Sequence, residues 1–134
     1  MENRDSDLQA LRPQLLNARV SNNMSEEEKF QNKTIRPIVK LQGELLIVVF
    51  KNYIKKRKNT FYELPLAKRF DFIENAIQRD TKFRNSLKGI IIGQFTVQEY
   101  ESYTLNSSAL NKRMMNIVKE RILDNIQLLE SAAA

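Results

Sequence analysis

The stretch TIRPIVKLQGELLIVVFKNYIKKRKN, from Thr34 to Asn59, decides the fold that we expect for this chain. Its apolar residues from Ile38 to Ile54 cover a wider face than the apolar stripe of an ordinary surface helix. We therefore predict one long central helix, capped by Thr34 and surrounded in its middle by other helices. The run 46–50 also fits a buried strand, but no second strand is evident to pair with it.

The end of this stretch is a block of four consecutive cations, Lys55, Lys56, Arg57 and Lys58, followed by Asn59 as a left-handed stop. Cations in the last turn of a helix are stabilised by its dipole. Four in a row, however, point around all sides of the helix and repel one another. A helix end that projects beyond the core toward phosphate groups explains the block better.

Capping signals divide the rest of the chain into further helices. A side chain that accepts a hydrogen bond from a backbone N–H two or three residues further on marks a helix start, and a Glu at the third position strengthens the signal. We predict such starts at Ser25, Asp80, Thr96 and Asn106–Ser108, with Gly93 as a helix stop and Gly89 as a point of close packing.

Apolar residues three or four positions apart mark the face of each helix that turns inward. We expect these faces to consist of Leu66, Phe70, Ile73 and Ile77, then Val97, Tyr100 and Leu105, and in the last helix Met115, Val118, Ile122, Ile126 and Leu129. The pattern predicts an all-α fold, a compact bundle of about five to six helices around one long central helix, with a flexible N-terminal arm.

The chain divides into a flexible N-terminal arm (1–23), a single helical domain (24–130) and a C-terminal tail (131–134). Pro13 biases the residue before it away from the helical conformation, so we expect the arm to be extended or disordered unless a partner orders it. A chain of 134 residues is long enough to bury one core without disulfides or a metal.

The composition excludes several kinds of function. The chain has no cysteine and no histidine, so it lacks thiolate and imidazole ligands, a cysteine nucleophile and the commonest general base. We therefore expect no enzyme activity, no metal, no cofactor and no small-molecule substrate. The longest apolar run, 45–50, is too short to span a bilayer, which predicts a cytoplasmic protein without a membrane partner.

Charge is distributed unevenly along the chain. The net charge of the whole chain is +6, and residues 1–30 hold four cations and six acids, which leaves +8 for the remainder. A mildly acidic leader before a basic body indicates an anionic partner, with RNA or DNA favoured over a membrane surface. The alternative is a solvated basic face that binds nothing.

Two classes of function fit these features. The first is an RNA-binding structural protein whose basic helix ends contact phosphates, with a nearby tyrosine stacked on a base. The second is a helical protein-interaction or regulatory module whose leader binds a partner through Leu8, Leu11, Leu15 and Leu16. The residues expected to bind nucleic acid are Lys51, Lys55, Lys56, Arg57, Lys58, Lys68, Arg69, Lys112 and Arg113, with Tyr53 and Tyr62 for base stacking.

Three segments resemble a small family found in Flavobacteria and related Bacteroidota: QNKTIRPIVKLQGELLIVVFKNY (31–53), FRNSLKGIIIGQFTVQEY (83–100) and NSSALNKRMMNIVKERI (106–122). Members of that family often carry the name glyoxalase. Glyoxalases bind their metal through His and Glu on paired βαβββ modules, which a helical chain without histidine does not offer. A glyoxalase-type enzyme is therefore the least favoured interpretation.

The chain also resembles the Bacteroidota-specific additional protein of the large ribosomal subunit, which is small, basic and cytoplasmic. This resemblance implies a ribosome-associated protein whose partners are ribosomal RNA and neighbouring ribosomal proteins. It implies that the RNA-binding protein of the first class acts at the ribosome.

Overall fold

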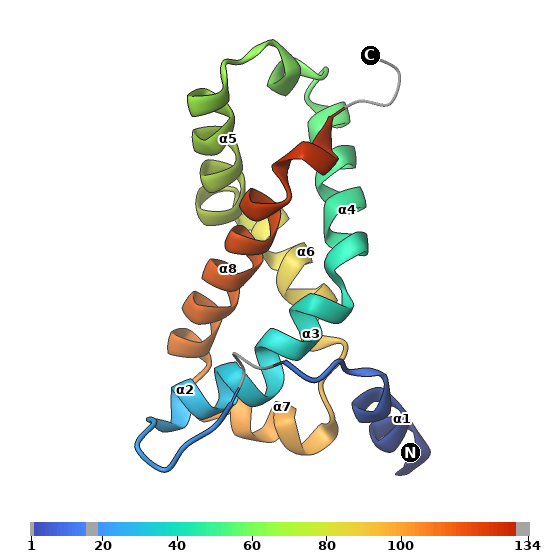
Figure 1. Ribbon diagram of the computed structural model, residues 1–134, viewed down its shortest axis with the longest axis vertical. Helices are drawn as coiled ribbons and strands as arrows, with labels where there is room; N and C mark the ends of the chain where they lie inside the picture. The colour runs from blue at the N-terminus through green and yellow to red at the C-terminus, as the bar shows by residue number, and fades with distance from the viewer. Residues whose placement is uncertain (1, 16–18, 131–134) are drawn as a thin grey trace.

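The computed structural model of the chain describes residues 2–15 and 19–130 (Figure 1). None of these residues lies in a strand, so the all-α prediction is confirmed. The elements are α1 (Glu2–Leu11), α2 (Glu26–Phe30), the π-helix η2 (Gln31–Ile35), α3 (Arg36–Leu41), α4 (Gly43–Lys56), the 3-10 helix η3 (Thr60–Glu63), α5 (Leu66–Arg79), α6 (Thr81–Ile92), α7 (Val97–Thr104), α8 (Ser107–Asp124) and the 3-10 helix η4 (Ile126–Leu129). The expected tail, 131–134, lies outside the described residues.

The helix at the centre of the bundle is α8. It contacts η2, α3, α4, α5, α6 and α7. In Figure 1, α4, α5 and α8 run along the long axis, and α1, α2 and α7 gather at the lower end. Every apolar residue expected to face inward from α8 and η4 is buried, apart from the half-buried Ile126. The core that results combines Phe50 and Ile54 with Ile73, Ile77, Leu87, Ile91, Met114 and Met115.

The expectation that other helices surround the middle of α4 is wrong. Leu45 and Val48 lie on its outer face and are 46% and 60% exposed.

The inward faces of α5 and α7 were also predicted only in part. Leu66 and Phe70 are exposed, as are all three residues expected to turn inward from α7, which buries only Tyr103 because it is a short helix at the edge of the bundle. Among the described residues, no helix is both long and apolar enough to cross a membrane.

The stretch from Thr34 to Asn59 is not one continuous helix. It breaks at Gln42, whose φ of −88° and ψ of 6° lie outside the helical region. Gly43 follows the break, and a Cβ atom there would lie only 2.6 Å from Nη2 of Arg121 in α8. A side chain of α8 therefore packs closely against Gly43. At Gly89, by contrast, an added Cβ would meet nothing within 4 Å, so close packing there is wrong.

Thr34 does not cap a helix, contrary to our prediction. Residues 26–41 form one winding segment in which η2 separates α2 from α3, and Thr34 is buried inside η2. Pro37 explains the widened turn, because it has no N–H and its ring would collide with the carbonyl of Lys33 in a regular α-helix. The N–H of Arg36 accordingly bonds to the carbonyl of Gln31, five residues back.

The N-terminal arm is not extended. Its residues 2–11 form α1, which lies against the turn between α6 and α7. The guanidinium of Arg4 donates to the carbonyls of Phe95 (3.1 Å) and Gly93 (3.2 Å), and Oδ2 of Asp5 accepts from the backbone N–H of Val97 (3.2 Å). A cation beside the end of α6 and an acid at the start of α7 complement the two helix dipoles. Contacts within the chain thus position this segment. Residues 1 and 16–18 of the arm lie outside the described residues.

Glu99 joins the leader to the helical body. Nη1 and Nη2 of Arg12 each donate to one of its carboxylate oxygens at 2.7 Å, and the two side chains are only 9% and 13% exposed. The same carboxylate accepts from the hydroxyl of Thr34 (3.1 Å) and from the backbone N–H of Thr96 (2.8 Å). The predicted capping box of α7 is confirmed. Its Glu also satisfies donors from two distant segments.

Replacement of Glu99 by Gln should remove much of the acid sensitivity of the fold. Burial alone would raise the pKa of Glu99, but hydrogen bonds from Arg12 and Thr96 together lower it below its ordinary 4.5. The carboxylate therefore stabilises the fold above about pH 4.5, and this stabilisation is lost as the pH falls through the lowered pKa. We expect Glu99→Gln to reduce the free energy of unfolding at pH 7 by about 2 to 4 kcal/mol, measured by urea denaturation.

Glu101→Gln is the matched control, because Glu101 is an exposed carboxylate on the same helix. Its unfolding free energy should follow the wild-type values from pH 7 to acid. The deficit of Glu99→Gln should shrink as the pH falls through the lowered pKa of Glu99. Equal behaviour of the two variants would show that the Arg12–Glu99 pair does not hold the leader.

Candidate nucleic-acid interface

The basic block ends α4 in a tight turn. Lys58 and Asn59 have φ angles of 59° and 58°, and the N–H of Asn59 bonds to the carbonyl of Ile54 at 3.1 Å. Asn59 is the left-handed stop that the sequence predicts. Asparagine tolerates this conformation, whereas a lysine in it costs about 1 to 2 kcal/mol, which glycine would avoid. Lys58 is thus retained at a position that is unfavourable for its backbone.

Arg57, in the middle of the block, is held by contacts within the chain. Its Nη2 atom forms an ion pair with Oδ2 of Asp80 at 2.7 Å, and Oδ2 also accepts from the hydroxyl of Tyr53 at 2.9 Å. Asp80 caps α6 as predicted, through the N–H of Phe83 (3.1 Å). This backbone bond, followed by that of Tyr53, lowers the pKa of Asp80. Three helices therefore meet at one carboxylate, and Arg57 is one of its fixed partners.

Tyr53, which we expected to stack on a base, has close neighbours at its ring within the chain. The guanidinium carbon of Arg57 lies 3.4 Å from the centre of its ring, and the ring of Phe83 lies 4.1 Å away. Two groups cannot share one face at these distances, so both faces of Tyr53 are covered. Burial, together with the bond to Asp80, raises the pKa of Tyr53 to about 12, so its hydroxyl remains a donor.

Tyr62 and Arg69 hold the turn η3 against the end of the chain. The hydroxyl of the half-buried Tyr62 donates to the carbonyl of Leu129, and burial raises the pKa of Tyr62. Arg69 pairs with Glu130 at 2.6 Å and donates to the carbonyls of Tyr62 (2.9 Å) and Leu64 (3.0 Å). All three nitrogen atoms of the Arg69 guanidinium therefore donate to groups within the chain.

Four lysines at this end of the molecule have no ion-pair partner among the described residues and can bind a ligand. Lys55, Lys56, Lys58 and Lys68 are exposed and make no ion pair with any described residue. Figure 1 shows the end of α4 and the start of α5 at the same upper end, joined by η3. We call these four residues the lysine tip. Lys51, further back on α4, is half-buried.

The remaining predicted cations, Lys112 and Arg113, do not join the lysine tip. They lie in the second turn of α8, whose start is at the opposite end of the bundle in Figure 1. Arg113 donates to Oε1 of Gln31 at 3.0 Å, which places it beside η2. The residues predicted to bind nucleic acid therefore lie at two ends of the bundle.

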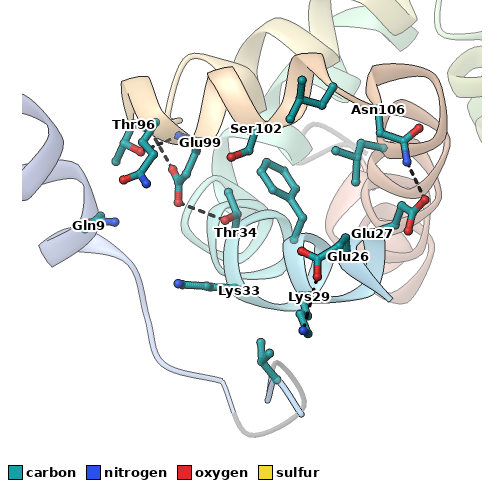
Figure 2. A pocket seen from close by; sticks show the side chains of 15 residues that line it. Gln9, Glu26, Glu27, Lys29, Lys33, Thr34, Thr96, Glu99, Ser102 and Asn106 are labelled. Atoms are coloured by element: carbon teal, nitrogen blue, oxygen red, sulfur yellow. Dashed lines mark hydrogen bonds and ion pairs between the residues drawn. The ribbon is translucent and has the colours of Figure 1, made fainter. Parts of the chain in front are cut away.

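A hollow of about 600 Å³ lies between the leader, the α2–η2 segment and α7 (Figure 2). Its charged groups are largely paired. Glu26 pairs with Lys29 at 3.5 Å, and Glu27 accepts from Nδ2 of Asn106 at 2.6 Å. In Figure 2, Gln9 borders the hollow on the side opposite Glu27 and Asn106. Of the charged side chains that line it, all but Lys33 have a hydrogen-bond or ion-pair partner among the described residues.

Over 2–15 and 19–130, no group of three or more acidic side chains comes together as a metal site would require. No protein-family model, no curated protein and no solved structure matches this chain. Its function is therefore argued from its own residues.

Replacing Arg57 and replacing Lys56 should have different effects, although the two residues are adjacent. Arg57→Gln removes an ion pair and a cation–π contact that are partly exposed to solvent, and should lower the free energy of unfolding by about 1 to 2 kcal/mol. Lys56→Gln removes an exposed charge and should change it by less than about 0.5 kcal/mol. Chemical denaturation measures both. Equal losses would mean that Arg57 is not a structural residue.

Proposed function

We propose that this chain is an RNA-binding structural protein that contacts RNA phosphates through the lysine tip. The observation that carries the proposal is the contrast within one short segment. Arg57 and Arg69 are bound by the fold, whereas Lys55, Lys56, Lys58 and Lys68 point their charges into solvent without a partner among the described residues. Lysines of this kind bind phosphates as point charges and release the counterions that surround RNA.

The energetic cost of the left-handed backbone conformation at Lys58 supports the same proposal. A glycine at position 58 would relax the left-handed backbone, yet the chain has a lysine there. Backbone strain of this kind is found where a side chain serves a function. The side chain of Lys58 makes no hydrogen bond or ion pair with a described residue that would offset this cost.

Neutralising the lysine tip should lower both RNA affinity and its dependence on salt. Each lysine–phosphate contact with single-stranded RNA adds about 0.7 to the slope of log K against log salt concentration. We expect Lys55→Gln/Lys56→Gln to reduce that slope by about 1 to 1.5, measured by fluorescence anisotropy with an unstructured RNA oligomer. The control Lys33→Gln/Lys88→Gln removes the same charge elsewhere. A slope that changes equally in both variants would contradict the proposal.

The resemblance to an additional large-subunit protein directs the proposal to the ribosome in the cytoplasm. Neighbouring ribosomal proteins would then be further partners of the chain. After sedimentation of a lysate through a sucrose gradient, we expect the protein with the large subunit at low salt and released from it at high salt. Migration apart from both ribosomes and RNA at low salt would reject this setting.

A second candidate function is a protein-interaction module. The favouring observation is the outer face of α4, where Leu45 and Val48 lie one turn apart and are both exposed. In the leader, Leu11 is exposed, Leu8 and Leu15 are half-buried, and Leu16 lies outside the described residues. A helical partner would cover the α4 face through its own apolar stripe. Leu45→Asp/Val48→Asp would then abolish partner capture and leave RNA affinity unchanged.

A further inference from the structure

A basic groove runs between the η2–α3 segment and α8, away from the lysine tip. Two hollows of about 210 and 400 Å³ open along it. They share Arg36, Ile117 and Glu120 in their walls, so they are two parts of one groove. Contacts of α8 with both η2 and α3 fix its sides. Its position is thus set by the packing of the core helices.

The groove has an excess of positive charge that the fold does not neutralise. Five cations and two acids line it, which leaves an excess of three. None of these cations forms an ion pair with a described residue, although both acids are exposed nearby. The cations are Arg36, Lys40, Lys112, Arg113 and Arg121, and the acids are Glu120 and Asp124. Unpaired cations around a concave surface attract anions into it.

Arg121 places a guanidinium in the wall of the groove. Its side chain lies against the backbone of Gly43, where a Cβ atom would come within 2.8 Å of Nε. That Nε atom is buried and has no acceptor among the described residues. A buried donor without an acceptor is unfavourable, because it has lost its hydrogen bond to water. The planar guanidinium of arginine is suited to the oxygen atoms of phosphate or carboxylate.

A purely structural role does not account for this arrangement. Arg121 lies near the C-terminal end of α3, where a cation is favourable, but it donates no hydrogen bond to a carbonyl there. Arg36 uses only Nε in the fold, donating to Oδ1 of Asn32 at 3.2 Å. The terminal nitrogen atoms of both arginines are therefore free to donate to a ligand.

We infer that this groove binds a phosphate group, held by Arg36 and Arg121 with Lys40 at the rim. Arg36 and Arg121 line the same hollow. The planar guanidinium of each can donate two parallel hydrogen bonds to phosphate oxygens. The phosphate belongs either to an RNA backbone or to a free phosphate compound. The inference does not rest on the lysine tip, because it uses other residues at another part of the surface.

Binding of two probes to the full chain tests the inference. The probes are inorganic pyrophosphate and an unstructured RNA oligomer, each titrated by calorimetry at low salt without divalent ions. The test variant is Arg36→Gln/Arg121→Gln, and the control is Arg79→Gln, which removes an exposed guanidinium from α5. We expect at least one probe to bind the test variant at least tenfold more weakly than the wild type. The control should stay within twofold.

The two probes distinguish the source of the phosphate. Loss of pyrophosphate binding in the test variant assigns the groove to a free phosphate compound, and loss of RNA binding alone assigns it to a nucleic-acid backbone. Wild-type affinities of the test variant for both probes would overturn the inference. Lys55→Gln/Lys56→Gln should leave pyrophosphate binding unchanged. The experiment therefore tests phosphate binding in the groove separately from RNA binding by the lysine tip.

Gly43→Ala provides a second variant that keeps every charge. The added methyl group displaces the flexible guanidinium of Arg121 rather than the backbone, and alanine is the better helix former. Phosphate binding should fall at least fivefold while the protein stays folded by circular dichroism. Unchanged binding would contradict the role of Arg121, even if Arg36→Gln/Arg121→Gln proved too unstable to measure.

Discussion

The arrangement of the lower half of the molecule depends on the hydrogen bonds that the carboxylate of Glu99 accepts. The carboxylate accepts four hydrogen bonds, two from Arg12 in the leader, one from Thr34 in η2 and one from the start of α7. Removal of the carboxylate would leave these buried donors without an acceptor, a large penalty for each of three segments. Because η2 also forms one side of the basic groove, the same carboxylate helps to position a surface that it does not touch.

Arginine and lysine have different roles in this chain. Arg12, Arg57 and Arg69 each make a short ion pair and further hydrogen bonds or ring contacts, as the planar, fork-shaped guanidinium favours. The lysines of the tip make none with described residues. The number of cations in the sequence therefore overstates the charge that is free at the tip. Arg36 and Arg121 differ from these three arginines, because their terminal nitrogen atoms have no partner among the described residues, and both line the groove.

Features that depend on neighbours in sequence were predictable, and features that depend on distant contacts were not. The caps at Ser25, Asp80 and Thr96 and the buried face of α8 follow from spacing alone. The leader was misjudged because its position depends on the pair between Arg12 and Glu99, which are 87 residues apart. The distance of Lys112 and Arg113 from the lysine tip could not be predicted for the same reason. Tyr53 illustrates the limit for the site, since spacing placed it beside cations but could not show Arg57 and Phe83 on its two faces.

Gly43 connects the break in the central stretch with the groove. The chain leaves the helix at Gln42, and the missing side chain at the next residue gives the guanidinium of Arg121 its place. The groove thus lies near the start of α4, and the lysine tip lies at its end. A helix of 14 residues is about 21 Å long, so the two surfaces are too far apart for one small phosphate compound. Only an extended polyanion that follows α4 can occupy both, and a ligand that occupies one of them leaves the other free.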